Sequence, residues 1–377
     1  MSTDHDTICM LRDAVRRYTS DHYGFHDRAR VLGQAPGYSA QAWRAYADFG
    51  WLALRLPEDD GGIDADAAAI GVLMEAAGSR LLLEPLLASA VLGTGLLLRQ
   101  GSVAQRQAWL PGLADGTLTL AFAHEDDARS PCVWRDGRLH GTKLGVLHGD
   151  RADRVIVAAR DQHGGALLCV VAAGDMAAQV YGLVDGRNAA NLRFDGSRAE
   201  LLGEPGRPAR EAIELALDEA AAALCAEAFG VIASLVAISC DYIKIRKQFG
   251  KPIGNNQVLQ HRMVDMYLLQ EEARALTTAA QQALALSAPE RARVVSGARA
   301  YVGAAVRRVA NEAVQLHGGL GITEELDVSH YFRRAMTIDS LFGGRDRHLA
   351  RFTDQTLAAC QGEHQGEHQG VPLCEPM

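Results

Sequence analysis

The spacing of apolar residues changes twice along the chain, and this change constrains the fold more than any other feature of the sequence. Over residues 8–113 apolar side chains recur every three or four positions, with breaks at Pro57 and at Glu84–Pro85, which is typical of helices. Residues 118–202 carry short alternating or β-branched runs between Asp/Gly turns, which is typical of strands. After the segment GEPGRP (203–208) the helical spacing returns.

This order predicts an α+β protein that is mostly α. We expect an N-terminal helical domain at residues 1–117, a central β-domain at 118–205, a C-terminal helical bundle at 206–357 and a disordered tail at 358–377. The long bundle helices are expected at about 209–239, 257–287, 290–317 and 325–357. Strands do not alternate with helices, and no GxGxxG follows a strand, so a Rossmann dinucleotide-binding core is disfavoured.

Composition and charge narrow the class of protein. The 377 residues are 48% hydrophobic and 22% charged, which is typical of a globular protein with a large core. A net charge of −8 offers no broad attraction to phosphate backbones, so nucleic acid is not expected as a partner. No apolar run approaches the roughly 20 residues that span a bilayer, so no membrane association is expected. The N-terminus also lacks the apolar stretch of a signal peptide.

The seven cysteines are scattered along the chain, and no CxxC pair occurs. This pattern favours reduced thiols in the cytoplasm over a disulfide framework or a zinc site. The sequence GEHQ occurs twice in the tail (362–365 and 366–369), and its two histidines invite a metal-binding interpretation. A flexible pair makes a poor metal site, so we expect no metal.

Two segments carry residues suited to a phosphate-bearing ligand. In RKQFGKPIGNNQ (246–257), Arg246 stands at a predicted helix end, where it can give two parallel charge-assisted hydrogen bonds to a pyrophosphate, and Phe249 follows it. In QLHGGLG (315–321), Gln315 ends a predicted helix and the glycines after it let a ligand approach the backbone closely. Each segment taken alone also fits a plain helix terminus on the surface.

Taken together, RKQFG followed downstream by QLHGGLG resembles the acyl-CoA dehydrogenase family. FGWLALRLPEDDGG (49–62) and LPGLADGTLTLAFAHED (110–126) resemble its N-terminal domain and the entry into its β-domain, and the resemblance runs to about Leu357. It implies a β-barrel-like central domain, a C-terminal four-helix bundle and FAD held between protomers. The residues that it assigns to FAD contacts are Arg246, Phe249, Gln257, Gln315, Gly318 and Gly319.

The chain departs from the family where the chemistry is expected. The family loop that presents the catalytic glutamate aligns with residues 341–344, so that Phe342 replaces the glutamate and Gly344 replaces a threonine that contacts the flavin. The family's Trp-x-Thr beside the flavin ring aligns with residues 145–147, Gly-Val-Leu. In the acidic-Gly-Ser loop, here HEDDARSP (124–131), only Ser130 keeps a polar contact expected for substrate.

A base elsewhere in the chain would have to lie on the first bundle helix. The family's second position for the base aligns with Ala220. Glu227 is the single carboxylate on the apolar helix face that contains Ala220, and it lies two turns beyond, so it is our candidate base. The alternative is that Glu227 pairs with an arginine or shapes the acyl pocket.

These departures are similar to the small subunits of pimeloyl-CoA-type dehydrogenases and to the heteromeric acyl-CoA dehydrogenases of steroid side-chain degradation. The leading hypothesis is therefore FAD-dependent α,β-desaturation of an acyl-CoA by one subunit of a homo- or heterotetramer, with an electron-transfer-flavoprotein-type acceptor. The alternatives are a non-catalytic subunit that completes the FAD site of a related large subunit, and flavin-dependent oxidation by oxygen on the same fold.

Overall fold

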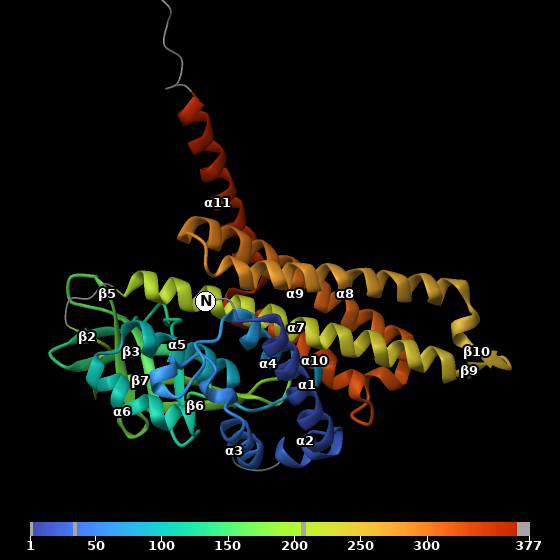
Figure 1. The fold of residues 1–377 in the computed structure, drawn as a ribbon, viewed down its shortest axis with the longest axis horizontal. Coiled ribbons are helices and arrows are strands. Elements are labelled where there is room, and N and C mark those ends of the chain that lie inside the picture. Colours follow the sequence, from blue (N-terminus) through green and yellow to red (C-terminus); the bar gives the residue numbers. More distant parts are fainter. Residues whose placement is uncertain (1–2, 33–35, 205–208, 368–377) are drawn as a thin grey trace, which may run out of the picture.

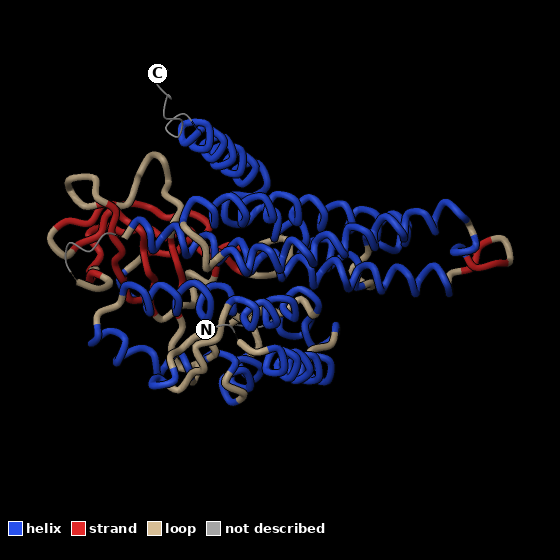
Figure 2. The backbone as a smooth tube through the Cα atoms, turned by 45° about the horizontal axis from the view of Figure 1, so that its top comes forward, coloured by secondary structure: helices blue, strands red, loops and turns tan. Residues whose placement is uncertain are grey.

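The structure is a computed structural model that describes residues 3–32, 36–204 and 209–367. Helices from the two ends of the chain pack together, and a sheet lies beside one end of the long C-terminal bundle (Figures 1 and 2). This arrangement confirms the predicted class, mostly helical with a central sheet between two helical regions.

The N-terminal region is a set of short helices around a shared apolar core. Its elements are α1 (His5–His22), α2 (Phe25–Leu32), α3 (Ala40–Asp48), the 3₁₀ turns η1 (Trp51–Ala53) and η2 (Glu58–Asp60), α4 (Ala67–Ser79), the π-helix η3 (Leu86–Gly93), α5 (Thr94–Gln100) and α6 (Val103–Ala114). Polar caps fix several starts: the Asp66 carboxylate accepts from the Ala68 N–H at 3.0 Å, and Ser102 and Gln105 form a capping box. The predicted breaks at Pro57 and Glu84–Pro85 both fall between these elements.

The central region forms an eight-stranded sheet in the order β6-β7-β3-β2-β4-β5-β8, with β1 paired to β4. Its strands are β1 (Leu120–Ala123), β2 (Val133–Arg135), β3 (Arg138–Leu147), β4 (Arg154–Arg160), β5 (Ala166–Ala172), β6 (Ala177–Gly182), β7 (Asn188–Arg198) and β8 (Glu200–Leu201), with the 3₁₀ turn η4 (Ala173–Asp175) after β5. Side chains alternate along a strand, so Val155 and Val157 of β4 enter the core of the sheet while Ile156 joins the larger core that contains the helices.

The bundle is built around α7 (Arg210–Ile245), which contacts α9, α4 and α8. The remaining elements are the hairpin strands β9 (Lys247–Gln248) and β10 (Lys251–Pro252), η5 (Ile253–Asn255), α8 (Gln257–Ala283), α9 (Ala288–His317), η6 (Gly318–Ile322), α10 (Asp327–Ser340), η7 (Leu341–Gly343) and α11 (Gly344–Glu367). Among the described helices α7 alone is long and apolar enough to cross a membrane, but 78% of its most apolar window is buried against other parts of the protein. It is the core helix of the bundle.

The C-terminal boundaries differ from the sequence-based expectation in two places. The single helix expected at 325–357 is two helices, because Phe342, Gly343 and Gly344 have positive φ angles of 54°, 102° and 58° that a right-handed helix cannot accommodate. The tail expected to be disordered from residue 358 is helical up to Glu367, where Ala, Gln and Glu are good helix formers. The rest of that expected tail, 368–377, lies outside the described residues.

Candidate functional site

The end of the bundle far from the main sheet carries the residues expected to contact FAD, and these residues are exposed. Arg246 follows α7, and its N–H and C=O are held by hydrogen bonds of 2.8 Å with Tyr242 and Ile253. The β9–β10 hairpin then projects from the bundle (Figure 1), with Phe249 at its turn, 99% exposed and in a left-handed conformation (φ 52°). Backbone bonds therefore fix the segment while its side chains stay free.

A second contact brings the Gly-rich segment to the same end. The ring of Tyr242, one turn before Arg246, stacks on His317 at 4.1 Å, just after Gln315 at the end of α9. Gln315 and Gln257 are exposed, and a Cβ added at Gly318 or Gly319 would meet nothing within 4 Å. We call Arg246, Phe249, Gln257, Gln315, Gly318 and Gly319 the bundle tip.

The chemistry of the bundle tip fits a dinucleotide. Arg246 forms no ion pair with any residue that the structure describes, so its guanidinium can meet a diphosphate. Phe249 offers a flat apolar ring, and the backbone at Gly318 and Gly319 is open to close approach. All of these groups face solvent, so one chain by itself covers only one side of such a ligand.

The 341–344 loop, where the resemblance leads us to expect the catalytic glutamate, is closed by an aromatic stack. Phe342 lies 5.0 Å from His124 of the β-domain, with 14° between the rings. Burial lowers the pKa of His124 to about 4, so the stack is uncharged at neutral pH. The loop is held from the bundle, because His348 lies 3.2 Å from the Phe342 carbonyl and Arg299 donates to the Leu341 carbonyl at 3.3 Å.

The β-domain positions offer few polar side chains. Val146 and Leu147 are buried in β3 as apolar core residues, and Gly145 has only its backbone N–H, which donates to Asn191 Oδ1 at 3.2 Å. Ser130 lies in a turn: its N–H donates to the Asp127 carbonyl at 2.9 Å, and its carbonyl accepts from the Thr142 N–H at 2.8 Å. The residue is half-buried, and the assignment of Ser130 to substrate stays a prediction.

Glu227 is fully buried on α7, and it is paired. Its Oε1 lies 2.6 Å from Arg334 of α10 and 3.3 Å from Arg187, while Asp185 bridges the same two arginines at 2.9 and 2.8 Å. Burial would raise the pKa of Asp185, but the two arginines hold it below its usual range. We call Asp185, Arg187, Glu227 and Arg334 the ionic cluster. The structure therefore shows the alternative in which Glu227 pairs with arginine.

The space beside the ionic cluster is small. A cavity of about 20 Å³ lies between Glu227, Arg187, His148 and Leu147, and such a volume holds a single water molecule. Glu227 Oε2 and Arg187 Nη2 are buried there without a hydrogen-bond partner among the described residues. An acyl group does not fit beside Glu227 in this conformation.

Sequence reasoning missed the arginines that clamp α7. Three neighbouring carboxylates of this helix are each held by two arginines from distant segments: Asp218 by Arg291 and Arg351, Glu219 by Arg55 and Arg99, and Glu227 by Arg187 and Arg334. The signal available was the three carboxylates themselves, because buried charges need partners. Their partners lie at separations of 40 to 164 residues from them, which no local pattern encodes.

Within the described residues the cysteines are free thiols, and no group of three or more His, Cys, Asp or Glu side chains is arranged to hold a metal ion.

Comparison with known proteins identifies the family. Family models for the acyl-CoA dehydrogenase N-terminal domain and C-terminal domain match residues 5–117 and 210–355. The chain is 30% identical over 328 residues to the acyl-CoA dehydrogenase IpdE2 of Mycobacterium tuberculosis, which covers 86% of this chain and 90% of that protein.

Solved structures give the same result. The chain is similar to a variant of the Tcur3481–Tcur3483 steroid ACAD, with a TM-score of 0.86, 27% identity, and coverage of 94% of this chain and 99% of that one. The fold also matches the ChsE4–ChsE5 complex of Mycobacterium tuberculosis, with a TM-score of 0.85, 24% identity, and coverage of 94% and 98%. With its helical ends, central sheet and matching sequence domains, the chain belongs to the acyl-CoA dehydrogenase family.

Proposed function

We propose that this chain is one subunit of a hetero-oligomeric FAD-dependent acyl-CoA dehydrogenase, and that a related subunit supplies the catalytic base. The reaction is the α,β-desaturation of an acyl-CoA, which needs a carboxylate to remove the α-proton and hydrogen bonds to the thioester carbonyl as the enolate develops. The observation that carries the proposal is the pairing of Glu227: the one carboxylate on the expected face of α7 is buried between Arg334 and Arg187.

The absence of a base from the catalytic loop supports the same assignment. Phe342 stands where the resemblance expects glutamate, and its stack on His124 fills the junction between the β-domain and the 341–344 loop with uncharged rings. A phenyl ring cannot accept a proton from the substrate. A subunit with this loop contributes binding surface rather than acid–base chemistry.

The contribution of this chain to the cofactor is the bundle tip. Arg246 would hold the diphosphate of FAD, and Phe249, Gln257, Gln315, Gly318 and Gly319 would pack around its diphosphate and adenine end. Bound FAD supplies the hydride acceptor for the desaturation. Because the tip is open to solvent on one side, the other half of the site comes from a neighbouring subunit.

The surface around the tip also supports assembly. Ile245, Val258, Val264 and Leu268 are exposed by 75%, 64%, 54% and 53%, and they follow the end of α7 and the exposed side of α8. Exposed apolar side chains that gather in this way mark protein–protein contacts. We infer a tetramer in the cytoplasm that passes electrons to an acceptor of the electron-transfer-flavoprotein type, with a lipid or steroid-type acyl-CoA as substrate, as the names of the similar proteins suggest.

The test is to express the chain alone and together with a related acyl-CoA dehydrogenase subunit from the same organism that carries the catalytic glutamate. We expect little FAD in the chain alone, and one FAD per heterodimer and full anaerobic flavin reduction by acyl-CoA in the pair. A chain that is monomeric, saturated with flavin and active by itself would contradict the proposal. In the active pair, replacing the partner's base should abolish flavin reduction, whereas Glu227→Gln should leave it unchanged.

A second candidate function is catalysis by this chain itself with Glu227 as the base. One observation favours it: Glu227 Oε2 is buried and has no partner among the described residues, so one oxygen is left to accept a proton. The Glu227→Gln variant separates the two. A loss of flavin reduction by several orders of magnitude, with flavin still bound, would assign the base to this chain.

A further inference from the structure

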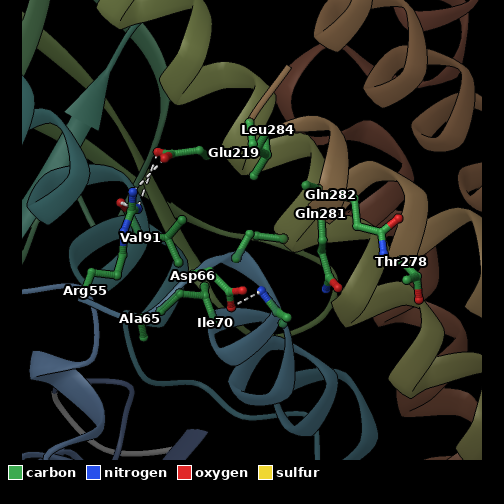
Figure 3. A pocket seen from close by; sticks show the side chains of 16 residues that line it. Arg55, Ala65, Asp66, Ile70, Val91, Glu219, Thr278, Gln281, Gln282 and Leu284 are labelled. Carbon is green, nitrogen blue, oxygen red and sulfur yellow. Dashed lines mark hydrogen bonds and ion pairs between the residues drawn. The ribbon is translucent and has the colours of Figure 1, made fainter. Parts of the chain in front are cut away.

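A cavity of about 700 Å³ lies between α4, α7 and the C-terminal end of α8 (Figure 3). Its walls are made largely of small apolar residues, among them Ala68 and Gly71 of α4, Ala222 and Ala223 of α7, and Ala285. Sites for small molecules have volumes of roughly 300–1,000 Å³ and combine apolar walls with a few polar groups. The cavity has the size and lining of such a site.

This cavity is distinct from the cofactor and base positions discussed above. It is lined by Glu219, Ala222 and Ala223, whereas Ala220 and Glu227 lie on another face of α7. At about 100° per residue, the two faces point roughly 100° apart. No residue of the bundle tip or of the ionic cluster lines it.

The charged groups at one end of the cavity are paired with one another. Arg55 donates to Glu219 at 2.6 Å and to the Val91 carbonyl at 2.7 Å, and Arg99 completes the pairing of Glu219 at 2.8 Å. Burial would raise the pKa of Glu219, but the two arginines hold it below its usual range. Each of these charges has a partner, and the Asp66 carboxylate, which caps α4 and also lines the cavity, brings the sum of the four charges to zero, so the cavity suits an uncharged ligand.

The other polar groups are the Asp66 carboxylate, which accepts hydrogen bonds from the N–H groups of Ala68 and Ala69 at the start of α4, and three neutral side chains of α8. Thr278, Gln281 and Gln282 line the cavity, and Gln281 reaches from α8 toward α4 (Figure 3). The side chain of Gln281 forms no hydrogen bond with any residue that the structure describes. A Cβ at position 71 would lie 2.0 Å from Gln281 Nε2, so Gly71 leaves the space that this amide occupies.

We propose that this cavity binds a small uncharged molecule with an apolar body and a hydroxyl or carbonyl group that hydrogen-bonds to Gln281. The apolar walls bury the body, the ion-paired Arg55–Glu219–Arg99 group forms a rigid end, and the free amide of Gln281 fixes the polar group. The site does not depend on the proposed role of the chain in catalysis, because it shares no residue with the flavin contacts.

The probe for this site is Nile red, an uncharged dye whose fluorescence rises in apolar surroundings, titrated into the full chain in the oligomeric state in which it purifies. We expect saturable binding that decan-1-ol displaces at least about tenfold better than decanoate, because no free cation is available to the carboxylate. Gln281→Leu should weaken decan-1-ol binding about fivefold through one lost hydrogen bond. Equal displacement by the acid and the alcohol would overturn the assignment of an uncharged ligand.

Two variants locate the binding. Ala68→Phe fills the cavity from the α4 side and Ala285→Phe from the α8 side, and each should abolish Nile red binding while leaving the unfolding temperature and flavin content unchanged. The matched control is Ala104→Phe, since Ala104 is exposed and holds the same second position in capped helix α6 that Ala68 holds in α4. Binding that survives both cavity variants, or cavity variants that alter only subunit assembly, would overturn the proposal.

Discussion

The bundle tip and the ionic cluster both contain arginine, but the arginine is exposed and unpaired in the first and buried and paired in the second. At the tip, Arg246 and Phe249 are exposed, and only their backbone is fixed. In the ionic cluster, the side chains of Arg334 and Glu227 are each only 1% exposed, and each pairs with residues from other segments. A free arginine on a rigid backbone is available to a ligand, whereas a buried and paired arginine stabilises the fold.

The largest expected effect comes from breaking the ionic cluster. Arg334→Met leaves Glu227 and Asp185 buried with only Arg187 as a partner, and it should lower the free energy of unfolding by about 3–5 kcal/mol. Urea denaturation measures this change. The control is Arg193→Met, which removes an exposed ion pair with Asp195 and should cost no more than about 1 kcal/mol. Equal losses in the two variants would remove the distinction between the buried and exposed sites.

Replacing the tip arginine should affect the cofactor and not the fold. Arg246→Ala removes a charge-assisted contact to the diphosphate and should weaken FAD binding about 10- to 100-fold in the assembled enzyme. Equilibrium titration with FAD and the flavin absorbance of the purified complex measure the effect. Lys247→Ala, at the neighbouring exposed position, is the control and should retain full flavin. Unchanged flavin occupancy in Arg246→Ala would contradict the assignment of the tip.

Acid should weaken the interior around the ionic cluster before it affects the tip. Burial, assisted by the positive charge of Arg187, lowers the pKa of His148 to about 4. Between about pH 6.5 and pH 4 the unfolded chain binds a proton at His148 that the folded chain does not bind. The stability that depends on a neutral His148 is therefore complete above pH 6.5 and is lost as the pH falls toward 4.

The expected contribution of His148 is a loss of about 1.4 kcal/mol per pH unit across this window. Urea denaturation at pH 7, 6 and 5 gives the slope. His148→Gln should reduce the slope by about one proton, whatever its effect on stability at pH 7. A slope that is the same in both proteins would show that His148 is not kept neutral by the fold.

The smallest expected effect on stability comes from the tip aromatic. Phe249 is 99% exposed, so Phe249→Ala should change the free energy of unfolding by no more than about 0.5 kcal/mol. The same variant should weaken flavin retention and subunit association, which analytical ultracentrifugation and absorbance measure. A large loss of stability in the isolated chain would mean that Phe249 packs within its own protomer.

The sequence predicted the helical and strand regions well, but it did not predict which residues form ion pairs across long separations in the chain. The change of periodicity gave the order of helical and strand regions, and the spacing on α7 correctly indicated that Glu227 faces the interior, where it is fully buried. The same pattern could not supply Arg187 and Arg334, which lie 40 and 107 residues away along the chain. The expectation of one continuous helix at 325–357 was also wrong, because the chain has positive φ angles at 342–344, where Phe342 contacts His124 and His348, both distant or non-adjacent in the sequence.

By itself, the sequence determined which segments are helical, which are strands, and which positions carry the motifs of the family, because these depend on local periodicity, turn residues and short spacings. The tertiary structure alone decided which charges are free and which are paired. Whether an arginine can bind a ligand depends on what surrounds it in space. Only the folded chain leaves Arg246 exposed to solvent and buries Arg334 in an ion pair with Glu227.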